Sequence, residues 1–330
     1  MKTTNHILLT GGTGFFGKAL LRYWIAIEST GKSIGQVTLL SRNPKKFAAE
    51  YPELVTHHWL HLIQGDVCDS ASLPKGQSFT HVLHAATEST AGPLLTPMQR
   101  FDQIVNGTRN ILDLAVASGA SRFLLTSSGG VYGPQPPDLE HIVEEYQGMP
   151  DPLNPNNSYS VAKRCAEHLC ALYQDQHGLE TVIARCFAFV GQDLPLDVHF
   201  AIGNFIRDAL TSPEINVNGD GTPVRSYMDQ RDLAQWLCVL LEEGVAGQAY
   251  NVGSDQSLTI RELANLIRDL LAPEKLVKIA CDTGVEGYRN RYVPEIKKTQ
   301  SELGLKITHK LTEAILTVAN HHVTTTSQCK

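Results

Sequence analysis

The amino-acid sequence predicts an α/β protein built on a doubly wound parallel sheet, together with a smaller mixed α/β lobe. Short runs of β-branched and aliphatic residues alternate with longer amphipathic segments, which is the pattern of β-α-β units. The first of these runs ends in a glycine-rich turn that opens a helical segment. After Gly191 the alternation gives way to loops, helices and a hairpin signal. These observations place the sheet in the first half of the chain and the lobe in the second.

The expected elements follow from residue periodicity. In the first half we expect strands at residues 6–10, 36–41, 60–64, 81–84, 122–127 and 181–184. Apolar residues recur every three or four positions in segments 15–27, 101–118 and 158–177, which are expected as helices. In the second half we expect a loop at 193–199, a hairpin at 218–223, a strand at 249–253, and helices at 200–210, 231–243 and 260–271. The polar residues 321–330 are expected to be frayed.

The composition is that of a globular protein. Its 330 residues include 28 Lys and Arg against 34 Asp and Glu, a formal charge of −6, which excludes a generally basic nucleic-acid binder. The seven cysteines are scattered without a Cys-x-x-Cys pair, so we expect neither a disulfide framework nor a metal site. The N-terminal apolar run is too short for a signal peptide, and no stretch approaches the roughly 20 apolar residues that span a bilayer. We therefore expect a cytoplasmic protein with no membrane partner.

The turn after the first strand has the spacing of a dinucleotide-binding loop. Its glycines are Gly11, Gly14 and Gly17, with Phe15 and Phe16 opening the helix. The first glycine permits the tight turn, the second allows close approach to a pyrophosphate, and the third allows close helix packing. No Gly-Lys-Ser/Thr follows, so the competing phosphate loop is absent. We therefore expect residues 1–185 to form a dinucleotide-binding Rossmann domain. Residues 186–330 would be mainly a substrate-binding lobe, with some segments returning to the first domain.

Two loops are expected at the adenosine end of the dinucleotide. Arg42 follows the second strand, where an NAD site usually presents an acidic residue, and a guanidinium can pair with a 2′-phosphate. NADP is therefore the first choice and NAD the alternative, and Arg42 could also be a solvated loop cation. After the third strand, Asp66 could accept from the adenine amino group and Val67 could pack on the ring, although Asp66 could equally be a helix cap.

Three side chains are expected to carry the chemistry. Tyr159 and Lys163 open a helix one turn apart, and therefore lie on the same face. An ammonium beside a phenol favours the phenolate, which can exchange a proton with a hydroxyl or a ketone. Ser128, at the end of the fifth strand, could donate to the same substrate oxygen. Together these residues predict transfer of one hydride and one proton.

With the glycine turn, this set resembles the extended short-chain dehydrogenase/reductase family, also described as the NAD-dependent epimerase/dehydratase family. Its members epimerise, dehydrate, decarboxylate or reduce nucleotide-linked sugars. The resemblance implies that Ala85 and Ala86 line the cofactor, that Thr87 reaches toward the substrate, and that Asn106 braces a helix at the cofactor. It also implies that Tyr159 and Lys163 contact the cofactor.

The resemblance extends into the lobe. Arg225 lies in a segment similar to the motif whose arginine holds the substrate diphosphate, and Arg289 or Arg291 could supply a second contact. His199 falls where some relatives hold a second acid, although an ordinary lobe histidine is the favoured interpretation. Family members pair as homodimers through two helices, here 101–118 and 158–177. The apolar contact would use Ile104, Ile111, Leu112, Cys165, Leu169 and Leu172, unless these residues simply pack on the sheet.

Departures from the family pattern narrow the reaction. The 4,6-dehydratases carry Asp-Glu after the catalytic hydroxyl, whereas this chain has Gly129 and Gly130, with Gly129 at the substrate. Elimination of water therefore loses its acid and base. What remains supports reduction of a 4-keto sugar, with Tyr159 as proton donor, Lys163 lowering its pKa and Ser128 orienting the oxygen. A 4-epimerase with retained NAD is the alternative. A non-catalytic dinucleotide-binding sensor or scaffold is the alternative of another class.

Overall fold

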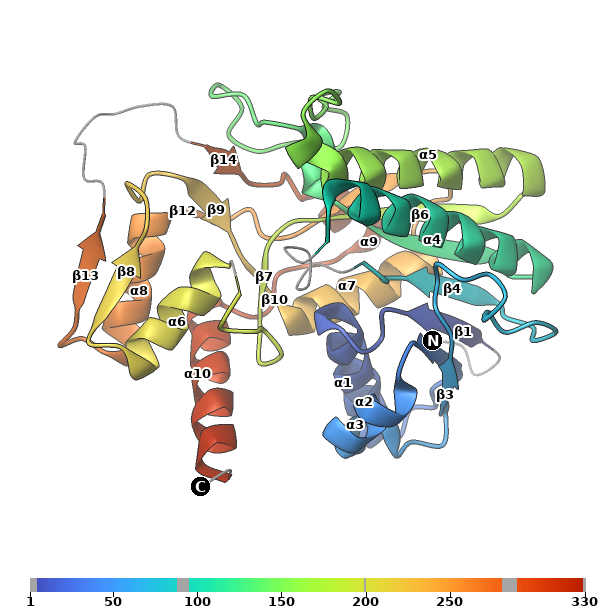
Figure 1. The fold of residues 1–330 in the computed structure, drawn as a ribbon, viewed down its shortest axis with the longest axis horizontal. Coiled ribbons are helices and arrows are strands. Elements are labelled where there is room, and N and C mark those ends of the chain that lie inside the picture. The colour runs from blue at the N-terminus through green and yellow to red at the C-terminus, as the bar shows by residue number, and fades with distance from the viewer. Residues whose placement is uncertain (1–4, 88–94, 199, 281–289, 329–330) are drawn as a thin grey trace.

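The computed structural model describes residues 5–87, 95–198, 200–280 and 290–328. A seven-stranded sheet with the order β3-β2-β1-β4-β5-β6-β11 forms the larger part of the molecule (Figure 1). Every pairing in this sheet is parallel, which confirms the predicted doubly wound fold. Its strands are β1 His6–Thr10, β2 Gln36–Ser41, β3 Leu60–Gln64, β4 His81–His84, β5 Arg122–Ser128, β6 Glu180–Cys186 and β11 Ala249–Val252. The strand order reverses between β1 and β4, so the ligand crevice is expected at their carboxyl ends.

Helices cover both faces of the sheet because each strand buries apolar side chains on both sides. On one face, α1 (Phe15–Ser29) and α7 (Gln230–Glu243) share a core with the strands, and α9 (Lys297–Leu303) packs at its edge. On the other face lie α4 (Pro97–Ala117) and α5 (Ser158–His177). The short helices α2 (Pro44–Glu50) and α3 (Pro52–Val55) follow β2. The chain thus returns from the lobe to the sheet to supply α7, β11 and α9.

The lobe has a hydrophobic core of its own. It contains α6 (Ala201–Thr211), α8 (Ile260–Leu271), α10 (Leu311–Gln328) and the parallel pair β8 (Glu214–Val217) and β13 (Leu276–Ile279). A sheet of β12 (Ser257–Thr259), β9 (Val224–Ser226) and β14 (Arg291–Tyr292) lies between the lobe and the large sheet in Figure 1. The strands β7 (Phe189–Val190) and β10 (Met228–Asp229) pair where the chain leaves and re-enters the first domain. Two 3₁₀ turns, η2 (Gly129–Tyr132) and η3 (Pro155–Asn157), precede α5.

The expectation of a frayed C-terminus is wrong, because α10 continues to Gln328. The helix is anchored by Ala314, Ile315, Val318 and Ala319, which are buried in the lobe core. Once this first half is docked, the polar second half can continue the same hydrogen-bond ladder, since propagation costs far less than nucleation. The polarity of residues 321–330 was therefore a poor guide to their backbone.

The side chains expected at a dimer contact mostly face inward. Ile104, Ile111, Leu112 and Leu169 are buried in the core beneath α4 and α5. They pack on the sheet of their own chain and cannot form the surface expected of them. Leu172 is 39% exposed and belongs to the outer face. The helical periodicity identified the apolar stripe correctly, but these side chains pack against the sheet and are not available to a partner.

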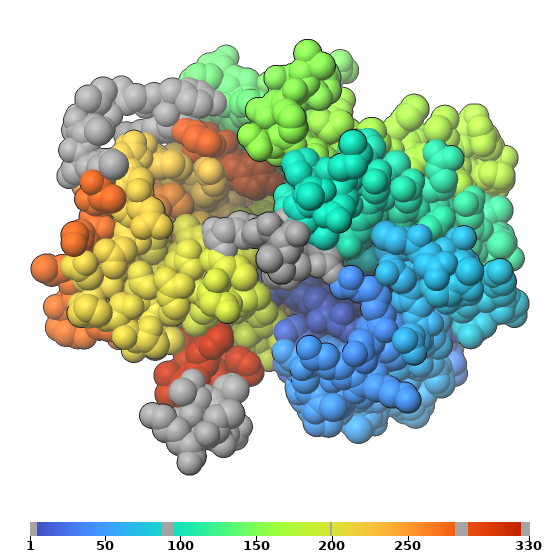
Figure 2. All heavy atoms as spheres, in the orientation of Figure 1, coloured from blue at the N-terminus to red at the C-terminus, as the bar shows by residue number. Residues whose placement is uncertain are grey.

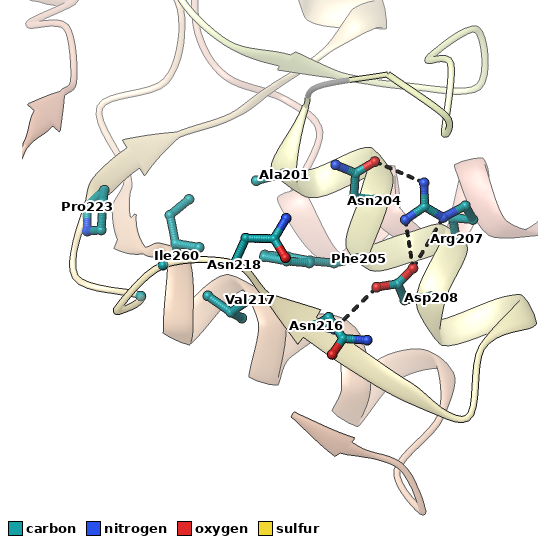
Figure 3. A pocket seen from close by; sticks show the side chains of 12 residues that line it. Ala201, Asn204, Phe205, Arg207, Asp208, Asn216, Val217, Asn218, Pro223 and Ile260 are labelled. Atoms are coloured by element: carbon teal, nitrogen blue, oxygen red, sulfur yellow. Dashed lines mark hydrogen bonds and ion pairs between the residues drawn. The ribbon is translucent and has the colours of Figure 1, made fainter. Parts of the chain in front are cut away.

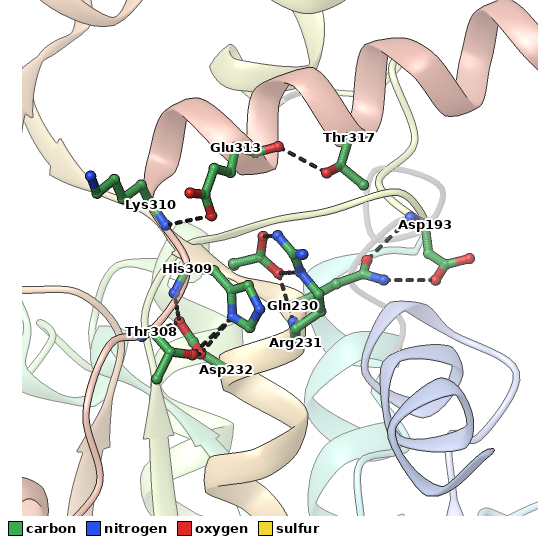
Figure 4. A network of polar contacts seen from close by, with 10 residues as sticks. Asp193, Gln230, Arg231, Asp232, Thr308, His309, Lys310, Glu313 and Thr317 are labelled. Carbon is green, nitrogen blue, oxygen red and sulfur yellow. Dashed lines mark hydrogen bonds and ion pairs between the residues drawn. The ribbon is translucent and has the colours of Figure 1, made fainter. Parts of the chain in front are cut away.

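Two buried carboxylates hold the lobe to the first domain (Figure 4). Asp193 Oδ2 accepts hydrogen bonds from Arg22 Nε at 3.0 Å and Gln230 Nε2 at 3.1 Å, and Lys18 Nζ lies 3.4 Å from Oδ1. Burial alone would raise the pKa of Asp193, but the Arg22 hydrogen bond and the Lys18 charge hold it below its ordinary value. Because Lys18 and Arg22 lie on α1, this contact fixes the helix of the glycine turn against the loop that enters the lobe.

The second carboxylate, Asp232 of α7, is fully buried. It accepts from the backbone N–H groups of Thr308 and His309, both at 3.0 Å, from the Thr308 hydroxyl, and from His309 Nδ1 at 2.8 Å. The start of α7 is thereby joined to the segment that leads into α10 (Figure 4).

Among the residues that the structure describes, no helix is long and apolar enough to cross a membrane.

Candidate active site

The glycine turn leaves the N-terminus of α1 open. At its first glycine there is no space for a side chain. Gly11 has a φ of +72°, and a Cβ there would overlap the carbonyl of Ala85 and come within 2.7 Å of Ala86 N. Gly14 is the N-cap of α1 and supplies no side-chain cap, which leaves the first N–H groups of the helix open to an anion. A Cβ on Gly17 would overlap the backbone of Gly12. The turn from Gly11 to Gly17 therefore fits a pyrophosphate at the N-terminus of α1.

The two phenylalanines after the turn point toward the lobe side. The ring of Phe16 meets that of Phe189 edge to face at a centroid distance of 5.2 Å, and Phe15 packs against the lobe core. Both rings are partly buried. In Figure 2 the surface is hollowed between the blue N-terminal segment and the yellow part of the lobe. A cofactor contact of Phe15 and Phe16 remains a prediction.

The loops expected at the adenosine end lie together. Arg42 is exposed at the end of β2, and its charge acts on Cys68, which follows Asp66 and Val67. Asp66 Oδ1 accepts from Cys68 N at 2.9 Å, so this carboxylate caps its own turn. A Cβ on Gly107 of α4 would come within 3.1 Å of Val67, which seats the loop on that helix.

Another asparagine of α4 holds the Val67 loop. Asn110 Nδ2 donates to Val67 O at 2.9 Å, and it lies one turn further along the helix than Asn106. Asn106 itself is exposed, and its helix-bracing role at the cofactor stays a prediction.

Lys163 is held deep in the site by two acceptors. It is 3% exposed, and Nζ donates to Thr87 Oγ1 at 2.8 Å and to Thr126 O at 2.7 Å. Its Nζ lies 5.9 Å from the centroid of the Tyr159 ring. Burial lowers the pKa of Lys163 to about 8. Thr87, expected to reach toward substrate, is thus a contact of the catalytic lysine.

Burial governs the pKa of Tyr159. It raises this pKa to about 12, and the groups that pull it down are the Ser128 hydroxyl and the charge of Arg100. Tyr159 is therefore a protonated group in this structure, suited to donate a proton to a developing alkoxide.

Ser128 ends β5 beside the rings of Phe187 and Tyr292, which we call the aromatic cover of Gly129. Its Oγ accepts from Gly130 N at 3.1 Å. A Cβ on Gly129 would come within 2.7 Å of both Phe187 Cζ and the Tyr292 hydroxyl. The rings of Phe187 and Tyr292 lie 4.6 Å apart and close the space beside Gly129. A carboxylate side chain at position 129 has no room in this arrangement.

The strand end that carries Ser128 is tied to the helix of Tyr159 and Lys163. Glu167, one turn after Lys163, accepts from Ser127 Oγ at 2.6 Å. Arg185 of β6 holds the same carboxylate through Nε at 3.1 Å and NH2 at 2.8 Å. This bidentate pair fixes β5, β6 and α5 together beneath the site.

His84, at the end of β4, is buried and neutral. Its Nδ1 lies 2.7 Å from Thr10 Oγ1 and its Nε2 3.3 Å from Thr108 Oγ1, which joins β1 to α4 behind the glycine turn. Burial, with a smaller effect of the Lys163 charge, lowers its pKa to about 3. The imidazole therefore stays uncharged over the physiological range.

Acid should destabilise the fold through His84. Between its unfolded pKa near 6.5 and its folded pKa of about 3, the unfolded chain binds a proton that the folded chain refuses, so stability falls as the pH falls. His84→Asn should reduce the slope of unfolding free energy against pH by up to about 1.4 kcal/mol per pH unit below pH 6.5. Urea unfolding at pH 7, 6, 5 and 4 measures this. His58→Asn, whose side chain is 85% exposed, is the control, and equal slopes for wild type and His84→Asn would contradict the assignment.

The structure describes some of the residues that were expected to bind substrate. Arg225 NH1 donates to Val224 O and Asn290 O, both at 2.8 Å, and burial lowers its pKa. In the β9–β14 pair Arg225 lies opposite Tyr292, and Arg291 lies opposite Val224. The structure therefore brings Arg225 beside the aromatic cover of Gly129. His199 and Arg289 lie outside the described residues.

A cavity of about 380 Å³ opens in the lobe near the start of β9 (Figure 3). Its polar side is a chain in which Arg207 donates to Asn204 Oδ1 and Asp208 Oδ1, and Asp208 Oδ2 accepts from Asn216 N. The remaining lining comes from Ala201, Phe205, Val217, Asn218, Gly219, Gly221, Pro223 and Ile260. The segment 218–223 forms one wall. The expected hairpin there is wrong, because this segment joins β8 to β9, which lie in different sheets.

Sequence reasoning missed two polar residues of the site. Tyr292 comes from β14, more than 100 residues away from Ser128. Arg100, in the first turn of α4, acts electrostatically on Tyr159, and its buried Nε lacks a hydrogen-bond partner among the described residues. Neither residue lies in a sequence motif that would mark it as part of the site. The one available signal is that Tyr292 shares a short segment with two candidate phosphate-binding arginines.

Comparison with known proteins supports the family. The model of the NAD dependent epimerase/dehydratase family matches residues 7–253. UDP-glucuronic acid decarboxylase 6 of Arabidopsis thaliana is 31% identical over 314 residues, which cover 94% of this chain and 86% of the relative. UDP-glucuronic acid decarboxylase 1 of Danio rerio is 29% identical over 303 residues, with coverage of 92% and 69%.

Solved structures share the fold. A dTDP-glucose 4,6-dehydratase from Streptomyces venezuelae, with NAD and TYD bound, superposes with a TM-score of 0.81 at 24% identity, covering 98% of each chain. RMD from Pseudomonas aeruginosa, complexed with NADPH, has a TM-score of 0.76 at 26% identity and covers 96% of this chain and 98% of its own. Together with the glycine turn and the Ser128, Tyr159 and Lys163 arrangement, these matches confirm the predicted resemblance. The chain belongs to the NAD-dependent epimerase/dehydratase family.

Proposed function

We propose that this protein reduces the 4-keto group of a nucleotide-linked sugar with a nicotinamide dinucleotide. The observation that carries the proposal is the composition of the site around Ser128. A protonated phenol and a buried lysine lie beside it, whereas Gly129 and Gly130 contribute no acid or base. Phe187 and Tyr292 occupy the space that a carboxylate at position 129 would need. These groups supply one proton and lack the acid and base that the dehydratases carry for elimination.

The residues divide the work between them. The bound dinucleotide supplies the hydride for the carbonyl carbon. Tyr159 gives its proton to the carbonyl oxygen, which becomes a hydroxyl. Ser128 donates to that oxygen and holds it in place. Lys163 keeps its charge beside the resulting phenolate and stabilises it. The atoms balance as one hydride and one proton added across the C=O bond.

The substrate would extend from this centre into the lobe. Arg225 lies beside the aromatic cover of Gly129 and has a guanidinium suited to a diphosphate. The lobe cavity of about 380 Å³ lies within the range for small-ligand sites and has a polar wall. We assign the nucleoside to it, with Arg291 as a second candidate phosphate contact.

The cofactor proposal is NADP, with NAD as the alternative. It rests on Arg42, an exposed cation at the end of β2 near the Asp66 loop. Arg42→Asp should lower the NADPH to NADH preference at least about tenfold, because a carboxylate repels a 2′-phosphate and suits a ribose hydroxyl. Fluorescence titrations with both cofactors measure the ratio. Lys45→Asp, two residues beyond Asn43, is the charge-matched control, and an unchanged ratio in Arg42→Asp would overturn the NADP assignment.

The reaction itself is tested by mixing the protein, NADPH and a 4-keto-6-deoxy sugar nucleotide. Loss of reduced-nicotinamide absorbance, one for one with product, supports the reductase. Interconversion of 4-epimers with no net use of the cofactor would instead identify a 4-epimerase. Dinucleotide binding without turnover of any nucleotide sugar would favour the sensor or scaffold class.

A second candidate substrate is a nucleotide-linked uronic acid. The relatives described above are named UDP-glucuronic acid decarboxylases, and Arg100 places a cation near Tyr159 with a buried Nε that lacks a partner among the described residues. Hydride transfer from C4 of a uronic acid to an oxidised nicotinamide would give a β-keto acid; after loss of CO₂ and protonation at C5, return of that hydride to C4 would restore the alcohol and the oxidised cofactor. Release of CO₂ from UDP-glucuronic acid without net cofactor consumption would select this candidate over the reductase.

We retain a homodimer as part of the proposal. The outer faces of α4 and α5 expose Val116 and Leu172, at 36% and 39% respectively, which is compatible with contact between copies. Leu172 belongs to the set expected from sequence, whereas Val116 does not.

A further inference from the structure

Two asparagines bring amide groups to the lobe cavity from different elements (Figure 3). Asn204 lies on α6, and Asn218 directly follows β8. Apolar lining comes from Phe205, Val217 and Ile260. A mostly apolar cavity selects its ligand through the few polar groups that converge on it. The polar atoms that the protein itself leaves unused are therefore the ones that decide which ring is accepted.

The Asn204 amide is held in one orientation. Arg207 NH1 donates to Asn204 Oδ1 at 3.2 Å. A guanidinium has only donors, so the amide oxygen must face Arg207, and Nδ2 with its two hydrogens is turned away from it (Figure 3). Among the described residues, Nδ2 donates to no protein acceptor. Asn204 thus presents a hydrogen-bond donor, and no acceptor, to the cavity that it lines.

Arg207 is itself fixed by several acceptors. Its Nε and NH2 donate to Asp208 Oδ1 at 3.2 Å and 2.9 Å, and its NH1 also donates to Leu196 O at 3.3 Å. Asp208 is 5% exposed, and its other oxygen accepts from Asn216 N at 3.2 Å. These contacts run from the backbone of β8 through Asp208 and Arg207 to Asn204. The amide orientation is therefore set before any ligand binds.

Asn218 is not held in this way. It is exposed, and its side chain makes no hydrogen bond within the part of the chain that the structure describes. Such an amide can turn either its oxygen or its NH2 group toward a ligand. Asn218 can therefore bind a donor or an acceptor, whereas Asn204 can bind only an acceptor.

From this arrangement we infer that Asn204 is a specificity-determining residue that selects the nucleobase of the substrate by the group at pyrimidine C4 or purine C6. The inference rests on the proposed function, which assigns the nucleoside to this cavity. Uracil, thymine and guanine carry a carbonyl oxygen at that position, which accepts from Nδ2. Cytosine and adenine carry an amino group there, which is itself a donor. Two donors that face each other stay unpaired, so the cavity discriminates against the amino bases.

Binding of nucleoside diphosphates to the protein saturated with NADP tests the inference, because NADP blocks the dinucleotide crevice. We expect UDP to bind at least about tenfold tighter than CDP in isothermal titration calorimetry. GDP and ADP make the same comparison for a purine, and the tighter of UDP and GDP identifies the ring that the cavity takes. Equal affinities within both pairs, or tighter binding of CDP or ADP, would overturn the inference.

Asn204→Asp tests the residue itself. The carboxylate has nearly the same size, keeps one oxygen on Arg207 and presents the other to the cavity, so the donor becomes an acceptor. We expect the ratio of UDP to CDP affinity to fall at least about tenfold, the equivalent of about 1.4 kcal/mol. Repulsion of the common diphosphate cancels in this ratio. An unchanged ratio would overturn the role of Asn204.

Asn218→Ala is the control. It removes an amide that can turn either way, so it should weaken UDP and CDP alike and leave their ratio nearly unchanged. A change of ratio as large as that in Asn204→Asp would show that selection does not depend on the fixed amide, and would contradict the inference. The wild-type ratio needs no variant and decides the matter even if Asn204→Asp does not fold.

None of these measurements involves turnover. A UDP preference that depends on Asn204, in a protein that reduces no keto sugar, would refute only the proposed reaction. Reduction of a keto sugar by a protein that binds UDP and CDP equally, and GDP and ADP equally, would refute only the selection by Asn204.

Discussion

Tyr159→Phe is expected to lower kcat roughly 10³-fold while leaving dinucleotide binding intact, since a positioned proton donor contributes about 10²–10⁴-fold. The phenylalanine keeps the ring that packs in the core beneath α5, so the fold should be unaffected. Only the proton for the carbonyl oxygen is lost. Stopped-flow measurement of reduced-nicotinamide absorbance gives the rate, and fluorescence titration gives the dinucleotide affinity.

The control for this variant is Tyr173→Phe on the same helix. Tyr173 donates to Asp113 at 2.5 Å, away from the Ser128 centre, so its loss should change kcat little. Full activity in Tyr159→Phe would remove the proposed proton donor and turn attention to the sensor or scaffold class. Loss of both activity and dinucleotide affinity would mean that the Tyr159 hydroxyl is chiefly a binding group.

The second large effect is expected at Gly11. Gly11→Ala combines a left-handed backbone, at φ +72°, with overlap of the new Cβ on the Ala85 carbonyl. The conformational penalty is about 1–2 kcal/mol and the overpacking about 1–3 kcal/mol, so we expect a loss of about 3 kcal/mol in unfolding free energy. Dinucleotide affinity should fall as well, because relieving the overlap moves the turn away from the N-terminus of α1. Urea unfolding and dinucleotide titration measure the two effects.

Gly31→Ala separates the two causes. Gly31 has a φ of +79°, but nothing lies within 4 Å of its Cβ position. Its alanine variant should therefore lose only the conformational part, about 1–2 kcal/mol, and should bind dinucleotide normally. Equal losses at Gly11 and Gly31 would show that the approach of Ala85 to the turn has no energetic consequence.

Local patterns in the sequence predicted the sheet and the proximity of Tyr159 and Lys163. The strands at 6–10, 36–41, 60–64 and 81–84 agree with the structure because their apolar runs are flanked by turns, and all but the edge strand 60–64 are largely buried on both sides. The helix at 158–177 also has its predicted bounds. Tyr159 and Lys163 share one helical turn, so their proximity follows from the 3.6-residue period alone.

The predictions from sequence were wrong where contacts with residues distant in the chain decide burial or backbone structure. Ile104, Ile111 and Leu112 form an apolar stripe that serves a dimer or a sheet equally well, and only packing shows that the sheet buries it. Burial raises the pKa of Tyr159 to about 12, an effect that the spacing of Tyr159 and Lys163 along the chain does not reveal. Helix α10 continues past residue 321 because its first half docks in the lobe.

The sequence by itself determined the dinucleotide turn, the order of strands and helices in the first half, and the Ser128, Tyr159 and Lys163 set. The turn and the pair of Tyr159 and Lys163 depend on residues that are neighbours in the chain or one helical turn apart, and Ser128 was placed by the end of its own strand. Tertiary structure alone decided that Tyr292 and Phe187 close over Gly129, that Arg100 acts on Tyr159, and that Asp193 joins α1 to the lobe. The physical reason is that these contacts join segments dozens to more than 150 residues apart, whose meeting depends on how the sheet and lobe pack.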